Sequence, residues 1–512
     1  MSTASRVIKN TGFLYVKMGI NVFISLYTTR IILESLGSSD FGIFNVVGGA
    51  IGMLGFLNST LAYATQRFMS YAEGEGKVIN KIKIFNVSIT LHLFIGFITA
   101  IALYFLMPFL FETILNIDPC RVFAAKVIYF SLIISSIFTI LGVPYDAVIN
   151  AHENMLFYSI LGVFESFLRL SVAFVCVFTT DDKLVVYGIL MAFIPLLSLV
   201  LMAFYCHKNY TECILRPIKY WDNKMVKTIA FFSGWNFLTA ISSLFSIQGL
   251  NLVLNHFYGT KLNAAQGVAN QLSCQLSSFS SNMLKALNPV IVKNAGSNDL
   301  HAMNRVTLSG CKFSALLIMF FAVPFIIEIK YVLGIWLTVV PEWTAVFCVL
   351  QLIQTIICQL ANPAATAVYA QGDIKGYAIY KSIMNILPLI LTYISFMCGA
   401  SPYWLYIPLI IFWAIGGDIV IIKYAEKKCF IKMSDFYRSV FLPVFYVLCS
   451  MFLIGCFPLL FLHASLVRLF LIFVLTTISM LFMVYRFGLN NIEKEFIHVV
   501  MNKFFAQRIR KN

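Results

Sequence analysis

The feature that most constrains this chain is a succession of long apolar segments, which repeat from residue 12 to residue 486 with only short polar connections. A helix needs about 20 largely apolar residues to cross a bilayer, and only helices or closed barrels satisfy their backbone hydrogen bonds in hydrocarbon. Because the segments are unbroken rather than alternating, they predict helices. We therefore expect an all-α membrane protein of about 14 transmembrane helices. No connection is long enough to hold a soluble enzyme domain.

The predicted transmembrane helices share this apolar character. The first carries Lys17 and continues to about residue 33, which is typical of a retained helix rather than a signal peptide. The helices are expected roughly at residues 12–32, 42–65, 85–107, 124–146, 157–178, 184–205, 229–255, 265–287, 311–333, 344–368, 377–398, 402–423, 437–459 and 464–486.

The basic residues predict the topology. The chain has 37 Lys and Arg against 22 Asp and Glu, a formal net charge of +15. If the amino terminus is cytoplasmic, 28 of the 37 fall in cytoplasmic segments and five in the opposite loops, as the positive-inside rule requires. This placement predicts a multi-pass membrane protein with both termini in the cytoplasm, and it leaves no excess charge for nucleic acid. Residues 489–512 are expected to form a cytoplasmic amphipathic tail on the membrane surface.

An internal repeat divides the chain. At an offset of 222 residues, Gly12, Gly37, Ser59 and Gly74 match Gly234, Gly259, Ser281 and Gly296. At an offset of 219, the matches are Pro144 with Pro363, Ala151 with Ala370, Tyr158 with Tyr377, and Tyr205 with Tyr424. The alternative is chance matching of common residues. The repeat predicts an amino-terminal lobe (1–215), a parallel carboxy-terminal lobe (216–432) and an appended helix pair (433–488).

Four basic side chains fall inside predicted membrane helices, all of them in the first lobe: Lys17, Arg30, Lys126 and Arg169. An ionisable group at mid-bilayer is costly, so it normally faces protein, water or a ligand. Arg169 is the deepest, although Glu165 four residues earlier could neutralise it as a structural pair. Lys17 shares a helix face with Asn21, which indicates a wet cavity, with snorkelling as the alternative. Arg30 and Lys126 lie near the opposite interface, where snorkelling is favoured.

Polar side chains also concentrate in the second and eighth helices, including Asn58 and Gln66 in the second and Gln266, Asn270 and Gln271 in the eighth. Such groups either join helices by hydrogen bonds or line a lumen. Their presence in matching helices of the two lobes favours a lumen. Asp418 in the twelfth helix is a lone acid, expected either to pack helices or, like Glu165, to couple an ion.

No motif for catalysis or a cofactor is present. The 12 cysteines are scattered without CxxC spacing, and no GxxxxGK[ST] motif occurs. We predict no catalytic residues, no metal site and no cofactor. A membrane glycosyltransferase or polymerase would need a large extracytoplasmic loop, and the longest one expected here has about 16 residues.

Several segments resemble a known family. The chain is similar to the polysaccharide-transport branch of the multidrug/oligosaccharidyl-lipid/polysaccharide exporter superfamily in Tyr27-Thr28-Thr29-Arg30, Leu36-Gly37-Ser38-Ser39-Asp40-Phe41-Gly42, Asn45-Val46-Val47-Gly48-Gly49, Ala64-Thr65-Gln66-Arg67-Phe68 and Gly267-Val268-Ala269-Asn270-Gln271-Leu272. The resemblance covers the whole chain in helix number and repeat. It implies two lobes around a cavity that opens alternately to either side of the membrane.

The resemblance implies a flippase of the bacterial cytoplasmic (inner) membrane for undecaprenyl-diphosphate-linked oligosaccharide repeat units, used in O-antigen or capsule assembly. Its implied partners are the lipid-linked oligosaccharide, membrane lipids, a polysaccharide polymerase and chain-length machinery. Because a diphosphate needs fixed cations along its path, Lys17, Arg67 and Arg169 are expected to handle it. Amides of the second and eighth helices would contact sugar hydroxyls. The alternative is a secondary exporter of drugs or metabolites on the same fold.

Overall fold

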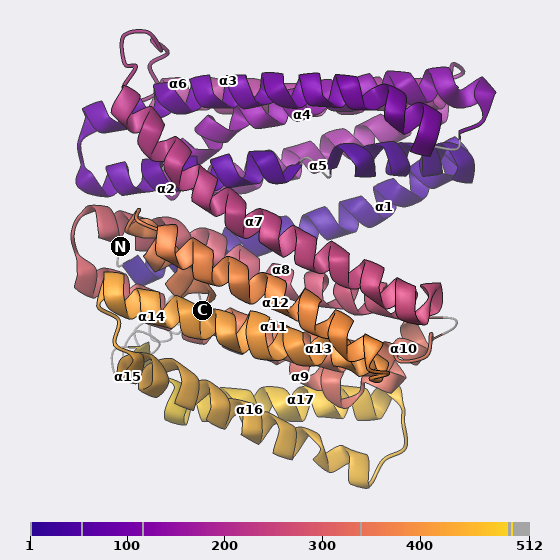
Figure 1. Ribbon diagram of the computed structural model, residues 1–512, viewed down its shortest axis with the longest axis vertical. Coiled ribbons are helices and arrows are strands. Elements are labelled where there is room, and N and C mark those ends of the chain that lie inside the picture. The colour runs from indigo at the N-terminus through magenta and orange to yellow at the C-terminus, as the bar shows by residue number, and fades with distance from the viewer. Residues whose placement is uncertain (1–2, 53–54, 115–116, 338–339, 490–492, 495–512) are drawn as a thin grey trace, which may run out of the picture. The chain divides into compact units, whose positions relative to one another are not determined.

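The protein is all-helical in the residues that its computed structural model describes, which are 3–52, 55–114, 117–337, 340–489 and 493–494. The predicted fold class is confirmed. The structure places α3 (Val78–Phe109), α4 (Val122–Ala151) and α6 (Lys183–Asn209) side by side (Figure 1). The predicted tail after residue 489 falls almost entirely outside the described residues.

The helix bounds follow most of the predicted segments, although α1 begins nine residues before the first of them and α8 ends nine residues beyond the eighth. The remaining elements are α1 (Thr3–Gly52), α2 (Gly55–Glu75), η1 (Leu110–Ile114), η2 (Pro119–Arg121), α5 (Met155–Phe178), α7 (Asn223–Tyr258), α8 (Thr260–Gly296), α9 (Leu300–Ile327), α10 (Ile329–Trp336), α11 (Thr344–Ala370), α12 (Lys375–Met397), η3 (Pro402–Leu405), α13 (Tyr406–Pro408), η4 (Leu409–Gly416), α14 (Gly417–Cys429), α15 (Met433–Phe436), η5 (Tyr437–Phe441), α16 (Leu442–Gly455), η6 (Phe457–Leu460), α17 (Leu466–Met483) and η7 (Val484–Gly488).

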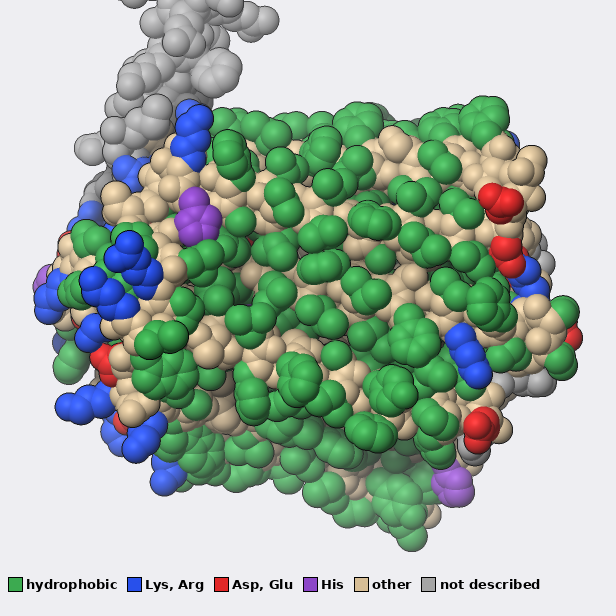
Figure 2. Space-filling model, turned by 90° about the horizontal axis from the view of Figure 1, so that it is seen from above, with side chains coloured by type: hydrophobic (Ala, Val, Ile, Leu, Met, Phe, Trp, Pro, Cys, Tyr) green, Lys and Arg blue, Asp and Glu red, His purple; other side chains and the backbone are tan. Residues whose placement is uncertain are grey.

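Twelve helical spans among the described residues are long and apolar enough to cross a membrane. The predicted spans at residues 42–65 and 265–287 are not among these twelve. In the described residues the first is divided between α1 and α2, and the second lies within α8. Figure 2 shows one face of the molecule, on which hydrophobic side chains cover the middle and Lys and Arg gather mainly at one end. This distribution is the one expected of a membrane protein whose charged residues lie outside the hydrocarbon.

The helix bounds repeat at the offsets found in the sequence. Gly37 interrupts α1, and Gly259 separates α7 from α8; both have a φ of 77°, a conformation that glycine adopts without strain. The helices α4 and α11 end at the matched residues Ala151 and Ala370. The same sequence positions thus have the same local structure in both copies.

The chain divides into two compact units. The first contains Met1–Ile241, Lys285–Met303 and Tyr369–Ile379, and the second contains Ser242–Leu284, Asn304–Val368 and Tyr380–Asn512. In the first unit, Tyr129 of α4 is fully buried and donates a hydrogen bond to the backbone oxygen of Leu103 in α3. In the second unit, α9, α11 and α16 share a core that includes Met319, Leu352 and Val447. The predicted lobe boundaries at residues 215 and 432 stay a prediction.

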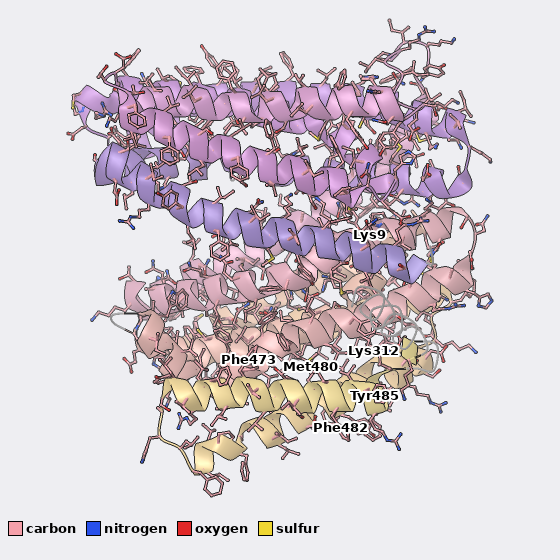
Figure 3. All side chains as sticks on the ribbon, turned by 180° about the vertical axis from the view of Figure 1, so that it is seen from behind. Lys9, Lys312, Phe473, Met480, Phe482 and Tyr485 are labelled. Atoms are coloured by element: carbon pink, nitrogen blue, oxygen red, sulfur yellow. The ribbon has the colours of Figure 1, made fainter. Side chains whose placement is uncertain are left out.

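The appended pair formed by α16 and α17 packs on the second unit. The ring of Phe473 in α17 lies 5.2 Å from that of Phe320 in α9, whereas Phe482 and Tyr485 are exposed (Figure 3). At one end of the pair, Lys312 of α9 makes an ion pair of 2.6 Å with Glu493. The pair is therefore held by both apolar and ionic contacts.

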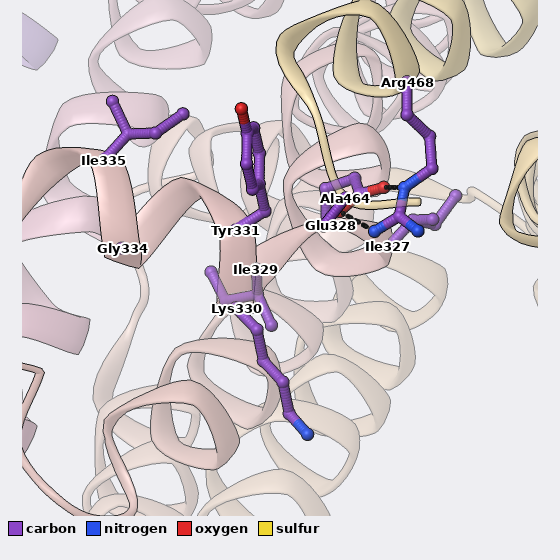
Figure 4. A pocket seen from close by; sticks show the side chains of 9 residues that line it. All are labelled: Ile327, Glu328, Ile329, Lys330, Tyr331, Gly334, Ile335, Ala464 and Arg468. Atoms are coloured by element: carbon purple, nitrogen blue, oxygen red, sulfur yellow. Dashed lines mark hydrogen bonds and ion pairs between the residues drawn. The ribbon is translucent and has the colours of Figure 1, made fainter. Parts of the chain in front are cut away.

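At the other end of the helix pair α16 and α17, the structure differs from the predicted ninth helix (311–333). Here the chain forms α9 and the short α10, with non-helical Glu328 between them. The carboxylate of Glu328 is buried and pairs through both oxygens with the guanidinium of Arg468 in α17. A pocket of about 680 Å³ opens beside this ion pair (Figure 4). The break places Glu328 where it can reach α17, a contact that hydropathy cannot predict.

Candidate functional site

A site that gathers positive charge lies between α1 and α5 in the first unit. The helix α5 begins after Asn154, whose side chain accepts a hydrogen bond from the backbone nitrogen of Phe157 and so caps the first turn. The Nζ of Lys17 in α1 lies 3.9 Å from the centre of the Tyr158 ring. A Cβ on Gly162, one turn further along α5, would lie 2.4 Å from this nitrogen. The absence of a side chain at position 162 therefore makes room for Lys17.

One turn further along, Asn21 faces the same helix. Its Oδ1 accepts a hydrogen bond of 2.9 Å from the hydroxyl of Ser166 in α5. Lys17 and Asn21 thus share one face of α1, as their spacing predicted, and that face packs against α5.

A second lysine joins this site from the other repeat. The Nζ of Lys285 in α8 lies 3.5 Å from the centre of the same Tyr158 ring, so the Lys17 and Lys285 nitrogens are less than about 8 Å apart. Asp146 in α4 is the acid whose charge acts on Lys285. Lys285 was not predicted as a site residue, because hydropathy places it at the cytoplasmic end of the eighth helix. The structure continues α8 for 11 more residues, about 16 Å.

The other predicted cations have different surroundings. Arg169 is exposed, and no acid in the described ranges lies within 4 Å of it. The suspected partner, Glu165, instead accepts a hydrogen bond of 2.6 Å from Ser198 in α6. Arg30 makes an exposed ion pair of 3.0 Å with Glu34, one turn along α1. Lys126 is half-buried and has no ion pair among the residues described.

Arg67 in α2 makes several contacts within the first unit. Its guanidinium donates to the backbone oxygens of Tyr369 and Ala370 at the end of α11, and it stacks on aromatic rings that include Phe68 and Phe232. Carbonyls at the end of a helix lack intrahelical partners and carry partial negative charge, so an arginine is well suited to cap them. Arg67 therefore connects α2 to the end of α11.

The predicted polar residues of α2 include an unsatisfied group. The buried Oδ1 of Asn58 accepts no hydrogen bond from any described residue, and Gln66 is half-buried. A buried polar atom without a partner is costly unless water or a ligand satisfies it. Asn58 therefore has an acceptor available for a further partner.

In the second unit, the predicted residues of α8 differ from one another in exposure. Gln266 is buried, accepts a hydrogen bond of 2.5 Å from Tyr406 and lies 3.5 Å from Asn270, whereas Gln271 is exposed. Gln266 thus joins helices while Gln271 is available to another partner.

Asp418 lies in the first turn of α14, which directly follows the π-helical segment η4. The Lys381 ammonium of α12 lies against Gly417 and donates to the backbone oxygen of Trp413, and its charge acts on Asp418. No basic group in the described segments lies within 4 Å of the Asp418 carboxylate. The two opposite charges are therefore neighbours without forming a direct ion pair.

One further cluster resembles a metal site in composition. Ligand atoms of Glu73, His152 and Glu212 lie within 4.8 Å of one another. However, Lys81 lies 2.8 Å from Glu73 and 3.9 Å from Glu212, and His152 pairs with Glu212 at 2.5 Å. Burial alone would raise the pKa of Glu212, but the hydrogen bond from His152 and the nearby charge of Lys81 outweigh it and lower this pKa. The acids are already neutralised, so the cluster is an ion-pair network.

The comparisons with known proteins identify the fold. No protein-family profile and no curated protein matches the sequence. Among solved structures, the chain is similar to a MATE transporter in its bent conformation (14% identity, TM-score 0.70, covering 84% of this chain and 96% of that one). It is also similar to a MATE transporter in complex with MaD3S (15% identity, TM-score 0.67, covering 83% of this chain and 96% of that one). A third similar structure is a MOP superfamily transporter from Pyrococcus furiosus (16% identity, TM-score 0.64, covering 82% of this chain and 93% of that one). The chain therefore has the fold of the MATE transporters of the MOP superfamily.

Proposed function

We propose that the protein is a flippase that moves undecaprenyl-diphosphate-linked oligosaccharide repeat units across the bacterial cytoplasmic membrane by alternating access. The product would enter O-antigen or capsule assembly, with a polysaccharide polymerase and chain-length machinery as partners. The transporter fold and the resemblance in α1, α2 and α8 support this proposal. The observation that carries it is the pair of lysines on the Tyr158 ring.

Two ammonium groups within about 8 Å repel each other, so a bound anion would stabilise the pair. A diphosphate carries about two negative charges at neutral pH and accepts several hydrogen bonds, and charge-assisted bonds are the strongest of their kind. Lys17 and Lys285 come from different repeats, so one diphosphate bound by both would connect α1 with α8. In the similar MOP superfamily transporter from Pyrococcus furiosus, reverse polarity of the binding pocket suggests a different function, which supports the use of pocket charge to propose a function on this fold.

The remaining predicted residues have roles along the same path in this proposal. Arg67 and Arg169 would attract the diphosphate or acidic sugars. Arg30 and Lys126 would act near the outer interface. The amides would contact sugar hydroxyls, and Glu165 and Asp418 would couple an ion. The amides are Asn21, Asn58, Gln66, Gln266, Asn270 and Gln271.

Lipid binding to the purified protein tests the proposal. Native mass spectrometry would compare undecaprenyl diphosphate with undecaprenol, which lacks the charge. We expect the diphosphate to bind more tightly, and Lys17→Met and Lys285→Met each to weaken its binding about tenfold, a loss of about 1.4 kcal/mol. Lys9→Met is the matched control, because Lys9 is also on α1 (Figure 3), eight residues or about 12 Å before Lys17, and its nitrogen lies over the ring of Phe13. Equal binding of both lipids, unaffected by either lysine, would contradict the proposal.

The alternative is a MATE-like exporter of drugs or metabolites. The solved structures named as MATE transporters favour it, as does an acid, Asp418, that has no direct ion pair in the described residues. Efflux of a cationic dye from vesicles distinguishes the two functions. Dye efflux that requires Asp418 and not Lys17 would favour the exporter.

A further inference from the structure

An acidic side chain, Asp418, lies deep along a membrane-spanning segment of the second unit. It is 11 residues from the end of α14 at Cys429, which is about 16 Å along the helix. The segment that contains it, Pro402–Cys429, is long and apolar enough to cross a membrane. An acid at such a depth is costly unless it faces a compensating charge, water or a ligand. Asp418 therefore needs a partner.

The partner among the described residues is Lys381 of α12, whose charge acts on Asp418. The Lys381 ammonium lies over the backbone of Gly417, the residue before the acid. A Cβ at Gly417 would be 2.1 Å from the Lys381 Nζ. The same nitrogen donates to the backbone oxygen of Trp413 at 3.4 Å. The glycine thus makes the room that the ammonium occupies beside the acid.

The Lys381 nitrogen lies among groups of the kind that bind a small cation. In membrane transporters, the backbone carbonyls of irregular helix segments coordinate Na⁺ or H⁺. Here Trp413 offers such a carbonyl from the π-helical segment η4, and Asp418 adds a carboxylate. The Asp418 charge also acts on the thiols of Cys358 in α11 and Cys311 in α9, groups that are never positive. The positive charge at this site is therefore supplied by the lysine.

We propose that Lys381 is the resident cation of the Asp418 site and excludes Na⁺ from it. A Na⁺ ion at the carboxylate would meet the like charge of the ammonium and would have to displace it. The inference rests on the proposed function only in that Asp418 is assigned there to ion coupling. With Lys381 in place, a Na⁺ gradient finds no free site at this acid. Without the ammonium, the carboxylate and the carbonyl become available to Na⁺.

Thermal unfolding of the purified protein in detergent tests the inference, with Na⁺ chloride and choline chloride compared at equal ionic strength. The parent protein should unfold at the same temperature in both salts, because its site is already occupied. Lys381→Met removes the ammonium and keeps the oxygens, so it should unfold about 3 °C or more higher in Na⁺. Adding Asp418→Asn should abolish this difference. Gly417→Ala displaces the ammonium without removing it and should produce a smaller difference in the same direction.

Lys423→Met is the matched control, because Lys423 is exposed on α14, five residues after Asp418. It should respond to the two salts as the parent does. Stabilisation of the parent by Na⁺ that Asp418→Asn removes would overturn the inference, and so would equal unfolding temperatures for folded Lys381→Met. If Lys381→Met does not fold, Gly417→Ala decides in its place. No undecaprenyl lipid is present in these measurements, so this inference and the flippase proposal can each fail alone.

Discussion

Replacing Gly162 with alanine would displace the Lys17 ammonium without removing a charge. The new Cβ would lie 2.1 Å from Cε of Lys17, whereas non-bonded carbons rest at about 3.5–4.0 Å, so the end of the lysine must shift by about 1.5 Å or more. The lysine end is flexible, so the shift costs little. The loss of the cation–π contact with Tyr158, about 0.5–2 kcal/mol, is offset by about 1 kcal/mol of helix propensity. The free energy of unfolding should therefore change by less than about 1 kcal/mol.

Binding should respond much more strongly than stability. If Lys17 holds the diphosphate, loss of one charge-assisted hydrogen bond costs about 1.5–3 kcal/mol, or about 10- to 100-fold in the affinity for undecaprenyl diphosphate. Native mass spectrometry would measure the affinity and thermal unfolding the stability. Gly19→Ala is the matched control, since a Cβ there would meet no atom within 4 Å. Unchanged affinity in folded Gly162→Ala would refute the assignment of Lys17. The assignment would also fail if Gly162→Ala weakened the affinity just as much in a protein that already carries Lys17→Met.

Two further predictions concern stability. The pKa of Glu212 is lower in the folded protein than in the unfolded chain. Its contribution to stability is therefore present above the ordinary carboxyl pKa and is lost as the pH falls through the lowered value. Thermal unfolding between pH 7 and pH 3 should show a smaller loss of stability in Glu212→Gln than in the parent protein. A pH dependence as steep in Glu212→Gln would contradict this. Arg468→Met should lower the free energy of unfolding by about 3–5 kcal/mol because it leaves the buried Glu328 carboxylate unpaired, and Glu328→Gln added to it should restore much of the loss. Chemical unfolding in detergent would measure both, and no recovery in the double variant would refute the reasoning.

The helices could be predicted because each membrane crossing is encoded locally, by a run of apolar residues. The sequence revealed that Gly37 and Gly259 are matched positions, but the positive φ that both share in the structure was not predicted. The ends of the helices were less predictable. Hydropathy detects the part of a helix that faces lipid, whereas α8 continues through polar sequence to Gly296. Lys285 was missed for this reason.

The site could be predicted only as far as one helix determines it. Lys17 and Asn21 were assigned to one face of α1, and the structure places that face against α5. Their partners come from other helices, so sequence spacing could not reveal them. For the same reason the local pairing of Arg169 with Glu165 was a reasonable expectation, but Ser198, 33 residues away, takes the carboxylate. The roles of these residues in transport stay predictions.

The helices α2 and α8 meet through matched glycines: a Cβ on Gly74 would lie 2.0 Å from the backbone oxygen of Lys293, and a Cβ on Gly296 would lie 2.0 Å from that of Tyr71. The reciprocity of this Gly74–Gly296 contact bears on how such a chain could arise. A contact in which each copy offers the same surface to the other is self-complementary, which is the defining property of a two-fold homodimer. A half-length protein carrying one copy of the repeat could therefore pair with itself through the same glycine. Duplication and fusion of its gene would keep that contact intact while freeing the two halves to diverge. Lys17 in one half and Thr239 at the matched position in the other would be a product of that divergence.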